Sequence, residues 1–321
     1  MAGVKNDFSS VMEPTDIRSG ESEPSCAREL VSVIIPTRNR PDQLSRAIES
    51  VLDQSHKDLE IIVIDDGSTP PARIEQCDLR IRLIRNNVSR GAARARNTGI
   101  EVAEGRYICF LDDDDYYIPD KLSKQLEYLR RHPNVDMVFS NVMCDKGNGV
   151  QRPWLHDTYE YDFIKNLRRN RIHTDATLLR RHIVDRVNFA EVLSNFQDTE
   201  FFTRVSLHFT VGYLPEIVAV WHRDNRSDRL TLGHRAKKYE SYRLFVRSFE
   251  EVIDEHAGLR NHHYRRLVYM ALRLGDFSEC RRLFAKFGVL NSIMLIIRFY
   301  VSTKRKFPRL TVVSRDSDSD Q

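Results

Sequence analysis

Four consecutive aspartates, Asp112 to Asp115, are the residues of this chain whose type and spacing most clearly indicate chemistry. They follow the apolar run Tyr107 to Leu111, which reads as a buried strand, and precede a helix expected to begin at Pro119. Four adjacent carboxylates repel one another and raise one another's pKa values, which a bound cation would relieve. Mg²⁺ or Mn²⁺ prefers carboxylate oxygens, with phosphate oxygens and water completing the shell. The run predicts a metal shared with a phosphorylated ligand; the alternative is a solvated acidic turn or a helix-capping cluster.

The segments that must position these aspartates alternate between strand and helix patterns. Helical spacing predicts helices from Pro41, over 91–100 and from Pro119. Apolar, β-branched runs predict strands at 31–35, 59–64, 81–84, 107–111 and 135–140. This alternation predicts an α/β fold with a mostly parallel sheet flanked by helices. Ligands of such sheets bind beyond the carboxyl ends of the strands, where the four aspartates fall.

The second half of the chain carries a looser pattern. We expect strands near 175–180 and 217–221 and a helix over 196–205, followed by a polar stretch, 222–235, that suits a mobile loop. From Ala236 the chain reads as helical, with a hairpin broken at Gly275.

Composition indicates a soluble globular protein. Of the 321 residues 41% are hydrophobic and 30% are charged, and a net charge of +4 gives no argument for a nucleic-acid partner. The five cysteines are scattered without metal-ligand spacing, which suits a structural role in a reducing compartment. No apolar run reaches the length of a membrane span, and no signal peptide is visible. We expect a cytoplasmic protein. Peripheral contact with the inner face of the membrane through 287–309, and homo-oligomerisation through the C-terminal helices, stay open.

Four motifs in fixed order carry a resemblance to a known family. They are Val31–Arg40, Val63–Ser68, Gly91–Gly99 with Arg96-Asn97, and Gly105–Asp115. Together they closely resemble the family 2 glycosyltransferases, and the similarity covers residues from about 30 to 225. The resemblance implies the GT-A type of Rossmann-like fold, a nucleotide-sugar donor, a divalent metal and inversion at the anomeric carbon.

Composition, periodicity and the resemblance together predict a domain layout. Residues 1–28 are expected to be a disordered leader, and residues 29–234 the GT-A domain, with a nucleotide-binding half, 29–140, and an acceptor half, 141–234. A C-terminal helical region, 235–303, and a basic then acidic tail, 304–321, would complete the chain.

The resemblance assigns the nucleotide to the first half of the chain. The loop Pro36, Thr37, Arg38 and Asn39 would border the nucleotide. Asp66 would accept a hydrogen bond from the base, which suits the imide N–H of a uracil-type ring and makes UDP the leading donor nucleotide, before dTDP and GDP. Asp112 and Asp113 would also reach the nucleotide.

One arginine is expected beside the diphosphate. Arg96 matches a family position near the nucleotide, although Arg90 and Arg94 compete for the diphosphate contact. The alternative for Arg96 is an ion pair on the helix surface.

The metal is expected on the aspartate run. The family pattern maps onto Asp112, Asp113 and Asp114, with Asp114 as the direct ligand and Asp112 as the second candidate. Because aspartate stands at every position, the sequence leaves the register of the ligands open.

The catalytic base is expected at the start of a later helix. Gln197-Asp198 matches the acidic pair of the family, with Gln197 in place of the usual Glu. Asp198 would take the proton of the acceptor hydroxyl as its oxygen attacks the sugar. Its alternative is a helix cap, and Glu200 is the fallback base.

Three further residues complete the expected site. His222 and Arg223 match a segment that closes over the diphosphate, with a solvated loop as an equal alternative. His173 would face the acceptor, unless it is structural. The acceptor, a glycan, a glycolipid or a small molecule, is not fixed by the sequence.

Other classes of protein fit the residues less well. The main alternative is a noncatalytic nucleotide-sugar-binding protein, against which Asp66, the aspartate run and Asp198 all argue. A phosphotransfer domain would give no role to the pair at Asp198. A nucleotidyltransferase would carry a Gly-rich phosphate loop after its first strand, where this chain has Pro36.

Overall fold

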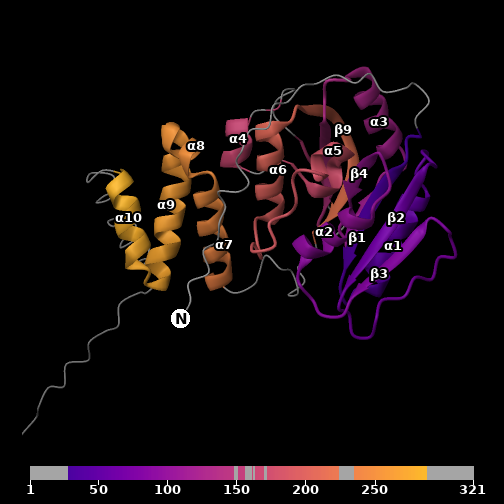
Figure 1. Cartoon of the computed structure of the whole chain (residues 1–321), viewed down its shortest axis with the longest axis horizontal. Helices are drawn as coiled ribbons and strands as arrows, with labels where there is room; N and C mark the ends of the chain where they lie inside the picture. The colour runs from indigo at the N-terminus through magenta and orange to yellow at the C-terminus, as the bar shows by residue number, and fades with distance from the viewer. Residues whose placement is uncertain are drawn as a thin grey trace, which may run out of the picture. The chain divides into compact units, whose positions relative to one another are not determined.

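The computed structural model describes residues 28–147, 151–155, 161, 163–169, 172–223 and 235–287 (Figure 1). The predicted leader, most of the polar stretch at 222–235 and the segment 287–309 proposed for membrane contact therefore lie almost wholly outside the described residues. The chain divides into two compact units, residues 1–248 and 249–321.

The first unit is organised around one mixed sheet. Parallel strands β3 (Ile81–Asn86), β2 (Leu59–Asp66), β1 (Val31–Thr37) and β4 (Tyr107–Phe110) lie side by side in that order. The sheet continues through β8 (Thr177–Arg180), β6 (Met137–Asp145), β9 (Val211–His222) and β5 (Tyr116–Tyr117). The prediction of a mostly parallel sheet flanked by helices is confirmed.

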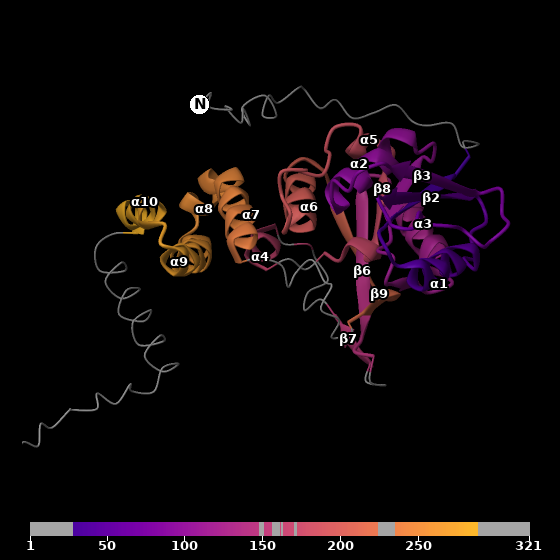
Figure 2. The ribbon, with the colours of Figure 1, turned by 90° about the horizontal axis from the view of Figure 1, so that it is seen from below.

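The added strands pair in mixed directions. β8 runs antiparallel to both β4 and β6, while β9 runs parallel to β6. A further strand, β7 (Gln151–Trp154), pairs antiparallel with β6, and Figure 2 shows it beside β6 and β9. The two-residue β5 and four-residue β7 were not predicted from the sequence, because such short pieces carry no measurable periodicity.

Helices cover both faces of the sheet, because alternate side chains of each strand point to opposite faces. On one face Val31, Val33 and Ile35 of β1 form a core with α1 (Pro41–Leu52) and α3 (Lys121–Arg131). On the other face Ile34 and its neighbours pack with α2 (Ala92–Val102) and α6 (Gln197–His208). The remaining elements of the first unit are α4 (Phe163–Arg168), the 3₁₀ helix η2 (Thr174–Ala176), α5 (Arg181–Val184) and α7 (Arg235–Ser248).

The strand register brings the acidic residues to one edge. Thr37 at the end of β1 pairs with Asp65 at the end of β2, and Ile34 pairs with Phe110 of β4. Asp65 and Asp66 therefore end β2 at the same edge from which the aspartate run leaves β4.

The part of the second unit that the structure describes, residues 249–287, contains α8 (Glu250–Glu255), α9 (Ala257–Leu274) and α10 (Phe277–Phe287). Its core holds Ile253, Leu267 and Leu283, which are fully buried. Gly275 ends α9 in the left-handed conformation (φ +74°), and Asp276 accepts a hydrogen bond from the Glu279 backbone N–H, as the capping-box spacing predicts.

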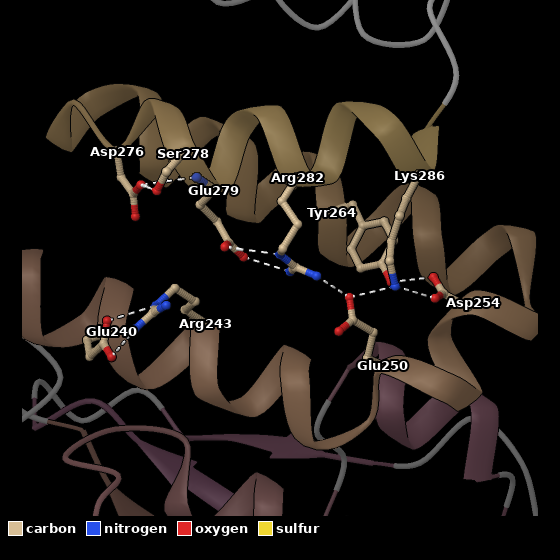
Figure 3. A network of polar contacts seen from close by, with 10 residues as sticks. All are labelled: Glu240, Arg243, Glu250, Asp254, Tyr264, Asp276, Ser278, Glu279, Arg282 and Lys286. Atoms are coloured by element: carbon tan, nitrogen blue, oxygen red, sulfur yellow. Dashed lines mark hydrogen bonds and ion pairs between the residues drawn. The ribbon is translucent and has the colours of Figure 1, made fainter. Parts of the chain in front are cut away.

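Ion pairs join α8 to α10 within the second unit (Figure 3). Arg282 pairs with Glu250 and Glu279, and Lys286 lies 2.5 Å from Asp254 and 2.8 Å from Glu250. Among the residues that the structure describes, no helix is both long and apolar enough to cross a bilayer. The predicted domain boundaries stay predictions, since compactness alone does not define a part that folds by itself.

Candidate active site

The aspartate run is held by basic and hydroxyl groups of the β1 loop. Thr37 donates its hydroxyl to Asp113 over 2.8 Å, and Arg40 donates to the same carboxylate over 2.9 Å. Asp113 is only 5% exposed, and this burial raises its pKa to about 6 against the opposing effects of Arg40 and Thr37. Arg40 also lies 3.1 Å from Asp114, whose side chain is 27% exposed. Asp113 therefore fixes the loop, while Asp114 keeps carboxylate surface for a ligand.

A second arginine faces the run from α2. Arg96 lies 2.5 Å from a carboxylate oxygen of Asp112, whose side chain is 36% exposed. The guanidinium is buried, and its Nε and Nη1 have no hydrogen-bond partner among the described residues. A buried cation with unmet donors is costly, so this arrangement suits an anion that binds beside Asp112. Arg96 is thus directed at the acidic site rather than at the helix surface.

The last aspartate of the run belongs to a buried acidic cluster that sequence reasoning missed. Asp115 is 1% exposed and accepts a hydrogen bond from the His222 backbone N–H over 2.7 Å. Its carboxylate lies within 4.8 Å of that of Asp175, which accepts the Asp112 backbone N–H over 2.9 Å. Asp175 Oδ2 lies 3.1 Å from His173 Nδ1, without the angle of a hydrogen bond.

The pKa values of the two carboxyl groups in this cluster are shifted in opposite directions. Burial and the nearby charge of Asp175 raise the pKa of Asp115 well above its usual range. Burial also acts to raise the pKa of Asp175, but the neighbouring His173 lowers it to about 2. One ligand atom from each of Asp115, His173 and Asp175 lies within 4.8 Å of the others, which is a geometry that metal sites also use.

Asp66 anchors the loop that opens α2. Its carboxylate accepts hydrogen bonds from the Asn86 amide (3.1 Å), the Ser89 hydroxyl (2.8 Å) and the Arg90 and Gly91 backbone N–H groups (3.0 and 2.8 Å). Burial raises its pKa, but these donors outweigh that effect and lower it, so Asp66 is ionised. Its roughly four lone-pair sites are thereby filled. A nucleotide base would have to replace one of these donors.

The predicted nucleotide loop is tied to the neighbouring turn. Asn39 accepts the Thr69 backbone N–H over 2.7 Å and donates its own N–H to Ser68 over 2.9 Å. The turn requires Gly67, which has φ +76° and whose missing Cβ would meet the Ser89 nitrogen at 2.8 Å. Arg38 is exposed and Pro36 is buried. The loop and the turn thus form one surface at the ends of β1 and β2.

The predicted base begins α6. Asp198 is half-buried and accepts the backbone N–H of Thr199 over 2.7 Å. The preceding Phe196 holds a left-handed conformation, φ +63°, which turns the chain into the helix. The fallback residue Glu200 is 3% exposed and engaged by Arg204 in two contacts, one of 2.8 Å. Asp198 is therefore the more accessible carboxylate of the two.

His173 lies beside Asp175. Burial lowers its pKa, but the charges of Asp175, Asp112 and Asp198 outweigh this and raise it. His222 ends β9 and Arg223 follows it, with the Arg223 backbone N–H donating to the Asp145 carbonyl over 2.6 Å. The structure thus brings Thr37, Arg96, the aspartate run, His173 and His222 together through direct contacts, with Asp198 close enough to act on His173 electrostatically.

Comparison with known proteins identifies the family. The model of the Glycosyl transferase family 2 matches residues 32–187. An uncharacterized glycosyltransferase of Haemophilus influenzae is 33% identical over 179 residues, which are 54% of this chain and 70% of the relative. The chain belongs to glycosyl transferase family 2. The protein is accordingly a glycosyltransferase.

A second relative shares the first half of the glycosyltransferase. The UDP-Glc:alpha-D-GlcNAc-diphosphoundecaprenol beta-1,3-glucosyltransferase WfaP of Escherichia coli is 42% identical over 123 residues, 37% of this chain. The match covers 48% of that relative, so the chain spans about half its length.

Solved structures share the fold. The Staphylococcus aureus protein TarS (residues 1–349), in complex with UDP-GlcNAc, aligns with a TM-score of 0.57 at 18% identity over 87% of this chain and 81% of that one. The mannosyltransferase PcManGT of Pyrobaculum calidifontis, in complex with GDP-Man and Mn²⁺, aligns with a TM-score of 0.52 at 17% identity over 92% of this chain and 85% of that one. The glycosyltransferase therefore has the GT-A-like fold expected from its motifs.

Proposed function

We propose that this glycosyltransferase moves a sugar from a UDP-sugar to a hydroxyl group of a glycan, a lipid-linked saccharide or a small molecule, with inversion at the anomeric carbon. The observation that carries the proposal is the convergence of Asp112, Asp114 and Arg96 at the carboxyl edge of the sheet. Carboxylates with exposed oxygens suit a divalent ion, and a guanidinium with unmet N–H groups suits phosphate. A metal-bound nucleoside diphosphate meets both requirements.

The preference for UDP rests on the relatives and on Asp66. The Escherichia coli relative is named for UDP-Glc, and the Staphylococcus aureus structure holds UDP-GlcNAc. An ionised Asp66 suits the imide N–H of uracil once one of its present donors is replaced. The Pyrobaculum calidifontis structure holds GDP-Man, so GDP belongs in any test.

We assign the metal to Asp114, with Asp112 as the second candidate. Both side chains are partly exposed, at 27% and 36%, and hard carboxylate oxygens are the donors that Mn²⁺ and Mg²⁺ take. The cluster of Asp115, His173 and Asp175 fits a cation shared with a diphosphate less well, because Asp115 and Asp175 are buried. A bound divalent ion would offset negative charge on the departing diphosphate.

We assign the base to Asp198. In a single displacement the acceptor oxygen bonds to the anomeric carbon, the bond from that carbon to the diphosphate oxygen breaks, and the acceptor proton passes to the base. Asp198 is half-buried at the start of α6, whereas Glu200 is held by Arg204. Arg96 would bind the diphosphate through the nitrogens that Asp112 does not use.

Calorimetry tests the donor site. Purified protein is titrated with UDP, dTDP and GDP, with and without Mn²⁺, as wild type, as Asp114→Ala and as Asp120→Ala. We expect UDP binding that depends on Mn²⁺ and is lost in Asp114→Ala. Asp120→Ala is the matched control, because it removes an exposed carboxylate six residues further along the chain, just before α3. If no nucleotide binds, or if nucleotide binding depends on neither Mn²⁺ nor Asp114, the proposal fails.

Asp198→Asn tests the base separately. The variant is expected to bind UDP as the wild type does and to transfer sugar at least about a hundredfold more slowly, since general base catalysis contributes ~10²–10⁴. Transfer at the wild-type rate in this variant would remove Asp198 from the mechanism while leaving the donor site standing.

A further inference from the structure

The two tryptophans of the chain lie against each other. Trp154 belongs to β7 and Trp221 to β9, 67 positions apart in sequence, and the chain holds only 2 tryptophans. Their ring centroids are 5.4 Å apart at an interplanar angle of 37°. Both strands pair with β6, where Val142 lies opposite Trp154 and Cys144 opposite Trp221. Both rings are half-buried, so each presents part of its surface to solvent.

A histidine joins this pair to the acidic site. The His173 ring lies 5.2 Å from Trp221 and 5.7 Å, edge to face, from Trp154. The same imidazole places Nδ1 3.1 Å from Asp175, which holds the backbone of Asp112. We call Trp154, Trp221 and His173 the aromatic cluster. It borders the acidic site directly.

The aromatic cluster lies on the side of the site opposite the nucleotide residues. Thr37 and Asp66 end β1 and β2, while the tryptophans stand on β7 and β9, and the order of strands places β4 with its aspartates between the two groups. The aspartates therefore have the nucleotide residues on one side and the aromatic cluster on the other, and the cluster's side is left for the acceptor.

We propose that the aromatic cluster is the subsite for the terminal pyranose of the acceptor. The proposal rests on the proposed function and adds to it the chemistry of the acceptor. One face of a pyranose ring carries mainly C–H groups, which pack flat on an aromatic ring, while its hydroxyl groups point outward to polar partners. Trp154 and Trp221 offer the flat apolar surface, and His173 offers a ring nitrogen at the inner end.

The competing explanation is that the tryptophans only extend the core. Both pack against the core that holds Val142 and Ala219. A purely structural pair would affect stability and would leave acceptor recognition unchanged. Measuring the acceptor KM therefore distinguishes the two explanations.

Tryptophan emission tests the subsite without any substitution. Since the chain has only these 2 tryptophans, its whole tryptophan emission comes from the aromatic cluster. The full chain is titrated with UDP and Mn²⁺, and separately with the methyl glycosides of glucose, N-acetylglucosamine, galactose and mannose and with an N-acetylglucosamine diphosphoryl-alkyl compound. We expect a saturable change with at least one saccharide and none with UDP alone. Emission that responds to none of these saccharides, or only to UDP, overturns the acceptor assignment.

Kinetics then separate recognition from folding. With the saccharide found by titration as acceptor, Trp154→Ala is expected to raise the acceptor KM by about tenfold, which corresponds to ~1.4 kcal/mol. Donor KM and hydrolysis of the UDP-sugar without acceptor should stay within about twofold, and Trp154→Phe should restore most of the acceptor affinity. Tyr128→Ala is the control, because it removes an aromatic ring stacked on His132 of α3. An unchanged acceptor KM in Trp154→Ala overturns the proposal.

The outcomes distinguish this proposal from the one on which it rests. If the wild type binds no nucleotide with Mn²⁺ in calorimetry, the donor assignment fails. If nucleotide binds and sugar is transferred, but Trp154→Ala keeps its acceptor KM, only the acceptor subsite fails.

Discussion

Arg96 differs from its neighbour Arg94 in the contacts that its side chain makes. It stands on α2 beside Arg94, and the two have similar sequence surroundings. Arg94 is paired with Glu101 and Glu191 at 3.1 and 3.2 Å. Arg96 instead turns inward, contacts Asp112 and lies over the Phe189 ring at 5.3 Å. Position on the helix, rather than residue type, separates a surface ion pair from a candidate phosphate ligand.

We predict that Arg96→Ala weakens UDP binding by about ten- to a hundredfold, because a hydrogen bond to a charged group contributes roughly 1.5–3 kcal/mol. Arg94→Ala, two positions earlier on the same helix, is expected to bind UDP as the wild type does. Calorimetry with Mn²⁺ present measures both. Equal losses in the two variants would indicate a general electrostatic effect instead of a contact by Arg96.

At the scale of elements, α3 holds the segment that carries Asp175. Lys121, fully buried, donates to the Thr177 carbonyl over 2.9 Å and to Gln125 over 2.7 Å. Gln125 in turn donates to the Ala176 carbonyl over 2.8 Å. Two residues of one helix turn thus fix the backbone on the C-terminal side of Asp175.

The lowered pKa of Lys121 makes the free energy of unfolding depend on pH. Burial lowers its pKa from 10.5 to about 8. Between these values the unfolded chain holds a proton that the folded protein has lost, so the free energy of unfolding rises with pH across that window. Relative to Lys121→Met, the wild type is expected to gain up to about 2–3 kcal/mol between about pH 8 and about pH 10. Urea unfolding of both proteins across this range measures the gain; parallel curves would contradict the lowered pKa.

The sequence predicts the elements with local periodicity and misses those that depend on distant pairing. The strands at 31–35, 59–64, 81–84 and 107–111 are found within two residues of their bounds as β1 to β4. Asp175 was missed as a site residue. It reaches Asp112 because β8 pairs with β4, where Ile108 lies opposite Leu179, and no local pattern encodes that pairing. The contact between Trp154 and Trp221 was also missed, because it too depends on pairing between strands that are distant in sequence.

At the scale of the whole molecule, α7 supports the start of α6. Ser241 accepts the Ser194 backbone N–H over 3.2 Å, and Tyr242 lies 5.2 Å from the Phe196 ring. Phe196 is the residue whose left-handed turn precedes Asp198. The first compact unit runs to residue 248, and the domain boundary at 234 stays a prediction.

Two truncations test this organisation. A chain ending at residue 248 is expected to fold and to bind UDP with Mn²⁺ as the full chain does. A chain ending at residue 234 loses the contacts to Phe196, and we expect it to be less stable by about 3 kcal/mol or more, because two buried aromatic residues, Tyr242 and Phe245, are removed. Thermal unfolding and calorimetry report the two properties. Equal stability and equal UDP binding of the two truncated chains would support the predicted boundary at 234.

The contact between Asp112 and Asp175 also bears on how the protein is made. The Asp112 backbone N–H meets a carboxylate 63 residues further along the chain. During synthesis the aspartate run leaves the ribosome well before Asp175, and β4 lacks its neighbour β8 until residue 180 has followed. The predicted nucleotide-binding half, residues 29–140, is therefore complete in sequence before the side chain that accepts the Asp112 N–H has been added. We expect the acidic loop to take its final position only after Asp175 has been synthesised.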